Sequence, residues 1–123
     1  MAEHPNVELA RRAQEAMERD GIAAIAEYLA DDVVWHEIGR SEPRRGRTDL
    51  AGAMGDVDYE ISWEPHDILG NEDHVVVLGN ATAKRDGRTL EYRIAEIYHV
   101  KDGKVTERWA FSDDTAAITA FFA

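Results

Sequence analysis

The chain has 123 residues, of which 44% are apolar and none is cysteine, and its formal net charge is −11. This length predicts one domain, residues 1–123, with a buried core. The excess of acidic groups argues against binding to nucleic acid or to an anionic membrane surface. The lack of cysteine excludes disulfides and thiolate metal sites and fits a cytoplasmic protein. No apolar run approaches the ~20 residues that a membrane span needs.

Two helices are predicted at the start of the chain. Asn6 can cap a helix over about residues 7–19, and Gly21 can end it. A strand over about residues 33–39 follows the second helix, and a short helix over about residues 48–54 comes after a polar loop. The second helix is predicted by four apolar residues at helical spacing: Ile22, Ile25, Ala26 and Leu29.

The rest of the chain has the pattern of an antiparallel meander that ends in a helix capped by Asp113 or Asp114. Two segments ending in Asp-Gly suggest three-residue hairpin loops, at residues 85–87 and 101–103. The order ααβαββββα predicts an α+β fold, a cone-shaped curved mixed or antiparallel sheet wrapped around the N-terminal helices. A pocket is expected between them. The meander strands are expected over about residues 59–64, 74–84, 88–100 and 104–112.

Glu37 is the first candidate for a catalytic residue. It falls in the first predicted strand, flanked by Trp35 and Ile38, where a surface strand would not need a charge. An acid among apolar side chains is suited to moving protons near neutral pH. If this strand slips by one residue, His36 takes the same place. The alternative is a strand-edge carboxylate that faces water or bonds to the loop over residues 44–47.

Glu96 and Arg108 form the second candidate pair. A three-residue loop over residues 101–103 would place them opposite each other on the last two strands, as partners in the pocket wall. The alternative is an ordinary cross-strand ion pair. Four further side chains share a predicted face with Glu37 or Glu96 and are expected to line the pocket, with ordinary core as the alternative: Trp35, Tyr92, Ile94 and Tyr98.

The histidines show no spacing typical of a metal site, and the chain has neither a P-loop nor a GxGxxG motif. No Ser-His-Asp set is recognisable either. The sequence therefore predicts neither a metal nor a cofactor. The five histidines are His4, His36, His66, His74 and His99.

The element order resembles the nuclear-transport-factor-two-like, or SnoaL-like, α+β barrel superfamily, which includes ketosteroid isomerases, limonene epoxide hydrolases and polyketide cyclases. The local motif is most similar to bacterial ketosteroid isomerase: Ala30-Asp31-Asp32, then a short strand with an acid, then Ser41-Glu42-Pro43-Arg44-Arg45-Gly46. The resemblance places that family's general base on Glu37 and its oxyanion-hole acid near Glu96.

Two departures from that family bear on the reaction. Its oxyanion-hole tyrosine would fall near Ala13, which donates no hydrogen bond, and both acids are glutamate rather than aspartate. A carboxylate beside Arg108 would also stay ionised, whereas the isomerase needs a protonated acid there.

The sequence thus predicts a cofactor-free general acid–base enzyme acting on a small, mostly apolar molecule, by isomerase-like proton transfer or by epoxide- or lactone-type hydrolysis. The first alternative is a binding module that holds a small hydrophobic ligand without turning it over. The second is an interaction platform with a vestigial pocket.

The opposite sheet face is expected to be apolar, with Ala95, Ile97, Val105, Trp109 and Phe111 on it. An apolar patch of this kind predicts a homodimer through the outer sheet face. The alternative is that the helices pack on this face.

Overall fold

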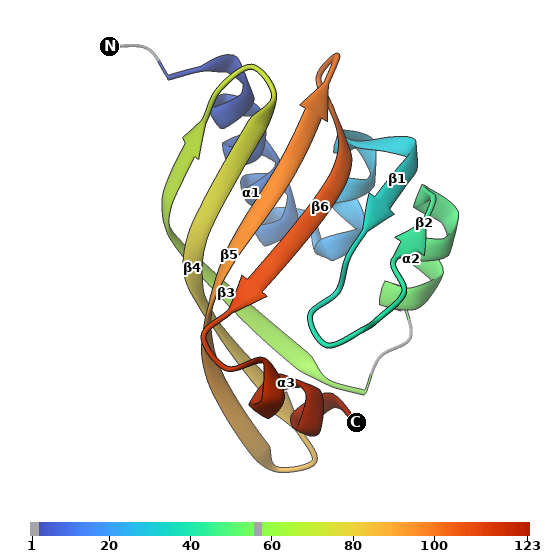
Figure 1. The fold of residues 1–123 in the computed structure, drawn as a ribbon, viewed down its shortest axis with the longest axis vertical. Helices are drawn as coiled ribbons and strands as arrows, with labels where there is room; N and C mark the ends of the chain where they lie inside the picture. Colours follow the sequence, from blue (N-terminus) through green and yellow to red (C-terminus); the bar gives the residue numbers. More distant parts are fainter. Residues whose placement is uncertain (1–2, 56–57) are drawn as a thin grey trace.

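The structure, a computed structural model, describes residues 3–55 and 58–123 and has the expected α+β architecture (Figure 1). One face of a curved, unclosed sheet carries α1, and α3 lies across the end of the sheet where the β4–β5 hairpin turns. None of the helices in these two ranges is long and apolar enough to cross a membrane. The helices are α1 (Pro5–Asp20), the 3₁₀ helix η1 (Ile22–Tyr28), α2 (Arg47–Gly55) and α3 (Thr115–Phe122).

The sheet has six strands in the order β2-β1-β6-β5-β4-β3. Neighbouring strands are antiparallel except β1 and β6, which run parallel. The predicted meander is confirmed as the contiguous block of four long strands. The strands are β1 (Leu29–Trp35), β2 (Arg44–Arg45), β3 (Glu60–Gly70), β4 (His74–Arg85), β5 (Arg88–Lys101) and β6 (Lys104–Ser112).

The N-terminal helix begins earlier than its sequence pattern predicts. Its cap is His4, whose Nδ1 accepts the Asn6 backbone N–H at 3.1 Å. The Asn6 side chain instead donates to the carbonyls of Asn71 and Glu72, at 3.0 and 2.9 Å. Asn6 therefore ties the start of α1 to the β3–β4 turn, and the prediction of Asn6 as the cap is wrong.

The first strand is shifted toward the N-terminus relative to its prediction. It covers Leu29–Trp35 rather than residues 33–39, and Leu29, expected in a helix, belongs to it. The chain leaves the strand after Trp35 and turns at Gly39, whose φ is +82°. A Cβ at Gly39 would lie 2.5 Å from the Thr119 hydroxyl oxygen, so this loop packs tightly against α3. Glu37 thus lies in a loop, not in a strand.

The two hairpin turns have two residues rather than the predicted three. Arg85 pairs with Arg88, and Lys101 pairs with Lys104. Both central residues of each turn have positive φ, 52° and 76° in one and 53° and 76° in the other, which is the type I′ geometry that Asp-Gly favours.

A bulge in β6 then resets the register of the last hairpin. Val100 pairs with Val105, but His99 pairs with Glu107, so Thr106 is the extra residue. The two-residue turn pairs Val105 with buried Val100, so Val105 packs against the core beside Leu29, and the bulge then returns Arg108 to the same face. Its predicted place on the outer face is wrong.

The helix-covered, or inner, face of the sheet carries the core. One cluster joins the first strand to α2, and a second lies under α1, where Leu9 and Ala10 pack against Val75 and Val77. The alternative that the helices cover the other face is therefore excluded. The buried residues of the two clusters are Leu29, Val33, Trp35 and Leu50, and Val75, Val77 and Val100.

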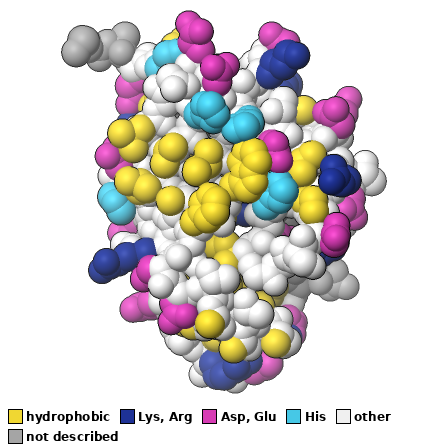
Figure 2. Space-filling model, viewed as in Figure 1, with side chains coloured by type: hydrophobic (Ala, Val, Ile, Leu, Met, Phe, Trp, Pro, Cys, Tyr) yellow, Lys and Arg dark blue, Asp and Glu magenta, His cyan; other side chains and the backbone are white. Residues whose placement is uncertain are grey.

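The outer face carries two apolar rows that cross the strands, one from β3 to β6 and one from β4 to β6 (Figure 2). Phe111 is 58% exposed and Leu69 48%. Histidine side chains border the apolar ones on this face. We call this set the outer patch: Leu69, Val76, Leu78, Ala95, Ile97, Trp109 and Phe111.

Candidate functional site

A buried ion pair lies at the centre of the inner sheet face. Arg108 donates from Nε and Nη2 to the same Glu96 oxygen, Oε2, at 3.0 and 2.8 Å. The Tyr98 hydroxyl donates to this oxygen as well, at 2.8 Å. The two charged side chains are only 10–11% exposed. The sequence prediction that Glu96 and Arg108 are partners is confirmed, although they are not directly opposite each other.

Arg108 is held on several sides. Its Nη1 donates to the backbone carbonyl of His36 at 2.9 Å, and its guanidinium lies 4.6 Å from the centroid of the Trp35 ring. Burial alone would lower the pKa of Arg108, but the Glu96 carboxylate and the Tyr98 hydroxyl together reverse this and raise it. Arg108 is therefore a permanent, fixed cation.

Three tyrosines have a raised pKa: Tyr98 and Tyr92 on the same strand as Glu96, and Tyr59 nearer to Glu37. Burial raises the pKa of Tyr98 well above its ordinary value, and the Glu96 charge adds to this. Burial likewise raises the pKa of Tyr92, although the Arg108 charge opposes this. It raises the pKa of Tyr59 too, with the Glu37 charge adding to it. All three hydroxyls are thus kept protonated at neutral pH and are able to donate hydrogen bonds.

One Glu96 oxygen, Oε1, accepts no hydrogen bond from the described residues. All three hydrogen bonds that the described residues give this carboxylate end on Oε2. No buried side-chain oxygen or nitrogen of these residues lacks a partner, so Oε1 is not sealed from open space. The neighbouring inner-face side chains are only half-buried, which leaves an open surface beside Glu96: Tyr92, Ile94, Ala110 and Ser112.

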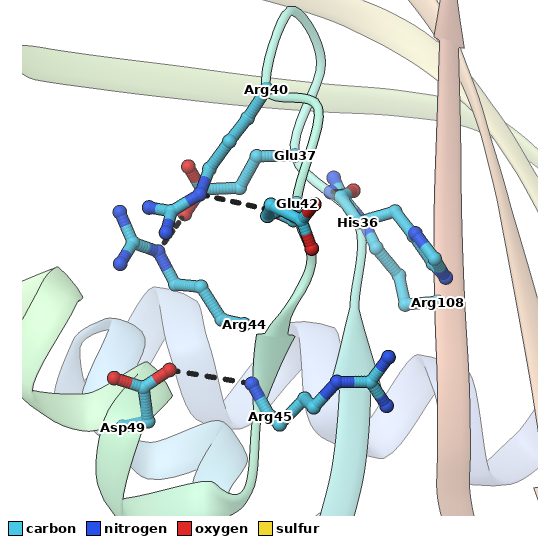
Figure 3. Close-up of polar contacts among 8 residues, drawn as sticks. All are labelled: His36, Glu37, Arg40, Glu42, Arg44, Arg45, Asp49 and Arg108. Atoms are coloured by element: carbon cyan, nitrogen blue, oxygen red, sulfur yellow. Dashed lines mark hydrogen bonds and ion pairs between the residues drawn. The ribbon is translucent and has the colours of Figure 1, made fainter.

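Glu37 forms a separate pair. Its Oε1 accepts from Arg44 Nε at 2.6 Å, and its side chain is 34% exposed. Figure 3 shows these two side chains pointing toward each other, away from Arg108. This hydrogen bond raises the pKa of Arg44. The apolar surroundings expected for Glu37 are not found, and its bond to the loop matches the alternative.

The structure brings most of the predicted site residues together, but not Glu37. Trp35, Tyr98, Glu96 and Arg108 form one contact network. Tyr92 and Ile94 lie further along the same face of β5. Among the described residues, Glu37 forms its ion pair with Arg44, whereas Arg108 forms its ion pair with Glu96.

The sequence analysis did not identify the Tyr59 side chain or the His36 backbone carbonyl as candidates for the site. Tyr59, whose ring contacts Phe122, was assigned only to a strand. The His36 carbonyl is a backbone group, and no residue pattern marks it. The alternation of Tyr59 with Ile61 and Trp63 was the only available signal for Tyr59.

Neither of the two main hollows of the described residues is the expected enclosed pocket beside Glu37 and Glu96. One hollow of about 620 Å³ reaches Tyr92 and is otherwise lined by polar groups such as Glu64, Thr82 and Asp113. A smaller one, of about 220 Å³, lies between α1 and β3. Neither is lined by Glu37, Glu96 or Arg108. Within residues 3–55 and 58–123, no three His, Asp or Glu side chains are placed to hold a metal ion.

The chain is similar to proteins of known sequence and structure over its full length. An uncharacterised protein of Mycobacterium tuberculosis is 28% identical over 131 aligned positions, which cover all of both chains. A protein of unknown function with a cystatin-like fold from Xanthomonas campestris superposes with a TM-score of 0.82 at 24% identity, covering 98% of this chain and 99% of that one.

A third similar structure comes from an enzyme. An epoxide hydrolase of the LEH-like type from M. tuberculosis superposes with a TM-score of 0.71 at 20% identity, covering 89% of this chain and 86% of that one. At this identity the similarity concerns the fold. The family model described as the SnoaL-like domain matches residues 10–108, and this chain therefore belongs to the SnoaL-like domain family.

Proposed function

We propose that this protein is a cofactor-free acid–base enzyme that transfers a proton on a small, mostly apolar substrate, with Glu96 as the proton acceptor. One observation supports this proposal: three hydrogen-bond donors bind Glu96 Oε2. Oε1 is then the oxygen that would accept the proton. A buried carboxylate fixed by a guanidinium and a hydroxyl needs no reorganisation when a substrate arrives.

The substrate would lie over Ile94, between Glu96 and Tyr92 on the same face of β5. Oε1 would take a proton from a carbon next to a carbonyl group, and the electron pair would move onto the carbonyl oxygen. Arg108 and the Tyr92 hydroxyl would stabilise that oxygen, and Oε1 would return the proton to the same carbon or to a conjugated one. A well-placed general base contributes about 10²–10⁴-fold to the rate.

The structure supports epoxide or lactone hydrolysis less well than proton transfer. Water activation by two acids on one arginine needs a second carboxylate at Arg108, but Glu37 is bonded to Arg44. Arg108 contacts the carboxylate of Glu96 and the His36 carbonyl. One carboxylate on one guanidinium favours a one-base proton transfer.

The test is deuterium exchange. Small cyclic ketones and enones are incubated with the protein in heavy water, and NMR follows the loss of the proton next to the carbonyl. We expect exchange with the wild type and a loss of about 10²-fold or more with Glu96→Gln. Glu91→Gln, on the exposed face of the same strand, is the matched control and should exchange like the wild type.

Glu37→Gln decides between the two carboxylates. If Glu96 is the acceptor, Glu37→Gln keeps most of the exchange. If Glu37→Gln abolishes exchange while Glu96→Gln retains it, the assignment to Glu96 is wrong, and the sequence-based assignment of the base to Glu37 is right.

A binding module is the second candidate, because both carboxylates are already paired with arginines. In that case the site would hold an apolar ligand on the half-buried side chains of Tyr92 and Ile94, without chemistry. Ligands that raise the melting temperature of the wild type, but show no exchange with any variant, would support this function over the enzyme.

A further inference from the structure

His36 lies at the junction between the two faces of the sheet. Its side chain is on the outer face, where Nε2 lies 2.8 Å from Glu107 Oε2 and the ring stacks on Trp109 at 5.2 Å with an angle of 4° between the planes. Its backbone carbonyl accepts the Nη1 proton of Arg108 on the inner face. One residue therefore contacts both the outer patch and the candidate active site.

The backbone at His36 has few other constraints. The first strand ends one residue earlier, at Trp35, and its register against β6 is broken between Leu29 and Val34. Beyond it lies only the two-residue strand β2, so this is the edge of the sheet. Among residues 3–55 and 58–123, the one backbone–backbone hydrogen bond of His36 runs from its N–H to the Arg108 carbonyl, at 2.9 Å. The contacts of the His36 side chain with Glu107 and Trp109 should therefore help to fix the direction of its carbonyl.

We propose that His36 is a positioning residue for Arg108. Glu107 and Trp109 fix its imidazole on the outer face, and its carbonyl thereby holds Nη1 while Nε and Nη2 stay on Glu96. Without the hydrogen bond to the His36 carbonyl, the Nη1 end of the guanidinium could rotate. The hydrogen bonds from Nε and Nη2 to Glu96 Oε2 would then weaken. The inference deepens the proposed function, because it assigns a residue that keeps Arg108 aligned for it.

Nitrogen-15 NMR of the Arg108 side chain tests this without a substrate. A guanidinium whose Nη atoms hold separate acceptors rotates slowly and shows separate Nη signals, which are assigned by their loss in Arg108→Lys. In His36→Ala we expect rotation faster by about tenfold, as one hydrogen bond to a charged group is weakened. In His36→Gln the amide can still donate to Glu107, and much of the slow rotation should return.

His74→Ala is the matched control. His74 is also an outer-face histidine in ring contact with a neighbour, His99, but it lies on β4, two strands away from Arg108. It should leave the Arg108 signals unchanged. Unchanged rotation in a folded His36→Ala, or equal changes in both variants, would overturn the proposal.

Glu107→Gln is a second test variant, needed if His36→Ala does not fold. It weakens the side-chain anchor but leaves His36 in place, so a smaller acceleration in the same direction is expected, and no acceleration would contradict the proposal. If exchange activity is found, His36→Ala should lower kcat more than it raises KM. If the wild type shows no exchange, the proposed function fails, while the NMR result still decides the role of His36.

Discussion

Glu96 and Arg108 meet diagonally across β5 and β6, because Tyr98, not Glu96, is the residue directly opposite Arg108. This diagonal places the Tyr98 hydroxyl beside the guanidinium, and both donate to one carboxylate oxygen. The offset therefore brings Tyr98 and Arg108 together on one Glu96 oxygen, as a three-member network.

We predict strong coupling within this pair. Glu96→Gln or Arg108→Met alone leaves a buried partner without its counter-charge and should cost about 3–5 kcal/mol in the free energy of unfolding. The double variant should cost clearly less than the two single changes added together. Urea unfolding of all four proteins measures this. Additive costs would mean that the two side chains do not meet in solution.

Tyr98 should make the protein sensitive to alkali. Because burial raises its pKa in the folded state, the stability it contributes is complete below the unfolded pKa of about 10 and is lost as the pH rises beyond it. At neutral pH, Tyr98→Phe should be less stable than the wild type by about 1–3 kcal/mol, through the lost bond to Glu96.

Urea unfolding at a series of pH values up to about 11 checks this. The stability gap between the two proteins should narrow as the pH rises, since only the wild type loses the Tyr98 contribution. Tyr59 and Tyr92 titrate in both proteins and cancel in the comparison. A gap that stays constant would contradict the raised pKa of Tyr98.

The outer patch should pair with a second copy of this chain. The protein carries a net charge of −11, and of the carboxylates that border the patch, Glu107 is bonded to His36. Twofold pairing of two such faces would bury the apolar rows. Light scattering should give about twice the chain mass of 13.8 kDa.

Trp109→Glu should reduce that mass to the monomer, because it replaces a large apolar side chain of the contact by a charge. Thr89→Glu adds the same charge at the exposed far end of β5 and should remain a dimer. A monomeric wild type, or a dimer that survives Trp109→Glu, would exclude this interface.

Replacing either of two glycines by alanine should change the stability of the protein, in opposite directions at the two positions. Gly103 has a φ of +76° in the β5–β6 turn, so Gly103→Ala should destabilise the protein by about 1–2 kcal/mol through backbone strain. Gly52 lies inside α2, and a Cβ there meets no atom within 4 Å. Gly52→Ala should stabilise by about 0.5–1 kcal/mol. Thermal unfolding measures both, and a stabilising Gly103→Ala would contradict the turn geometry.

Local patterns in the sequence determined most of the fold. β6 has the predicted bounds, and Asp114 caps the last helix as one of the two predicted residues. Alternation with a period of two fixes which face a side chain takes. The shorter turn and the one-residue bulge at Thr106 together shifted the partner of Arg108 from Glu96 to Tyr98, two residues away. A shift of two residues preserves the face, which is why the Glu96–Arg108 contact was still predictable.

Only the tertiary structure decided where Glu37 lies and what holds Arg108. Glu37 meets Arg44, seven residues further on, because the loop folds back to form β2 and packs through Gly39 on α3. The bond from Arg108 to the His36 carbonyl likewise depends on β1 lying parallel to a strand more than 70 residues later. Such contacts arise from packing between distant segments, which residue periodicity does not encode, whereas alternation and turn chemistry act within a few residues.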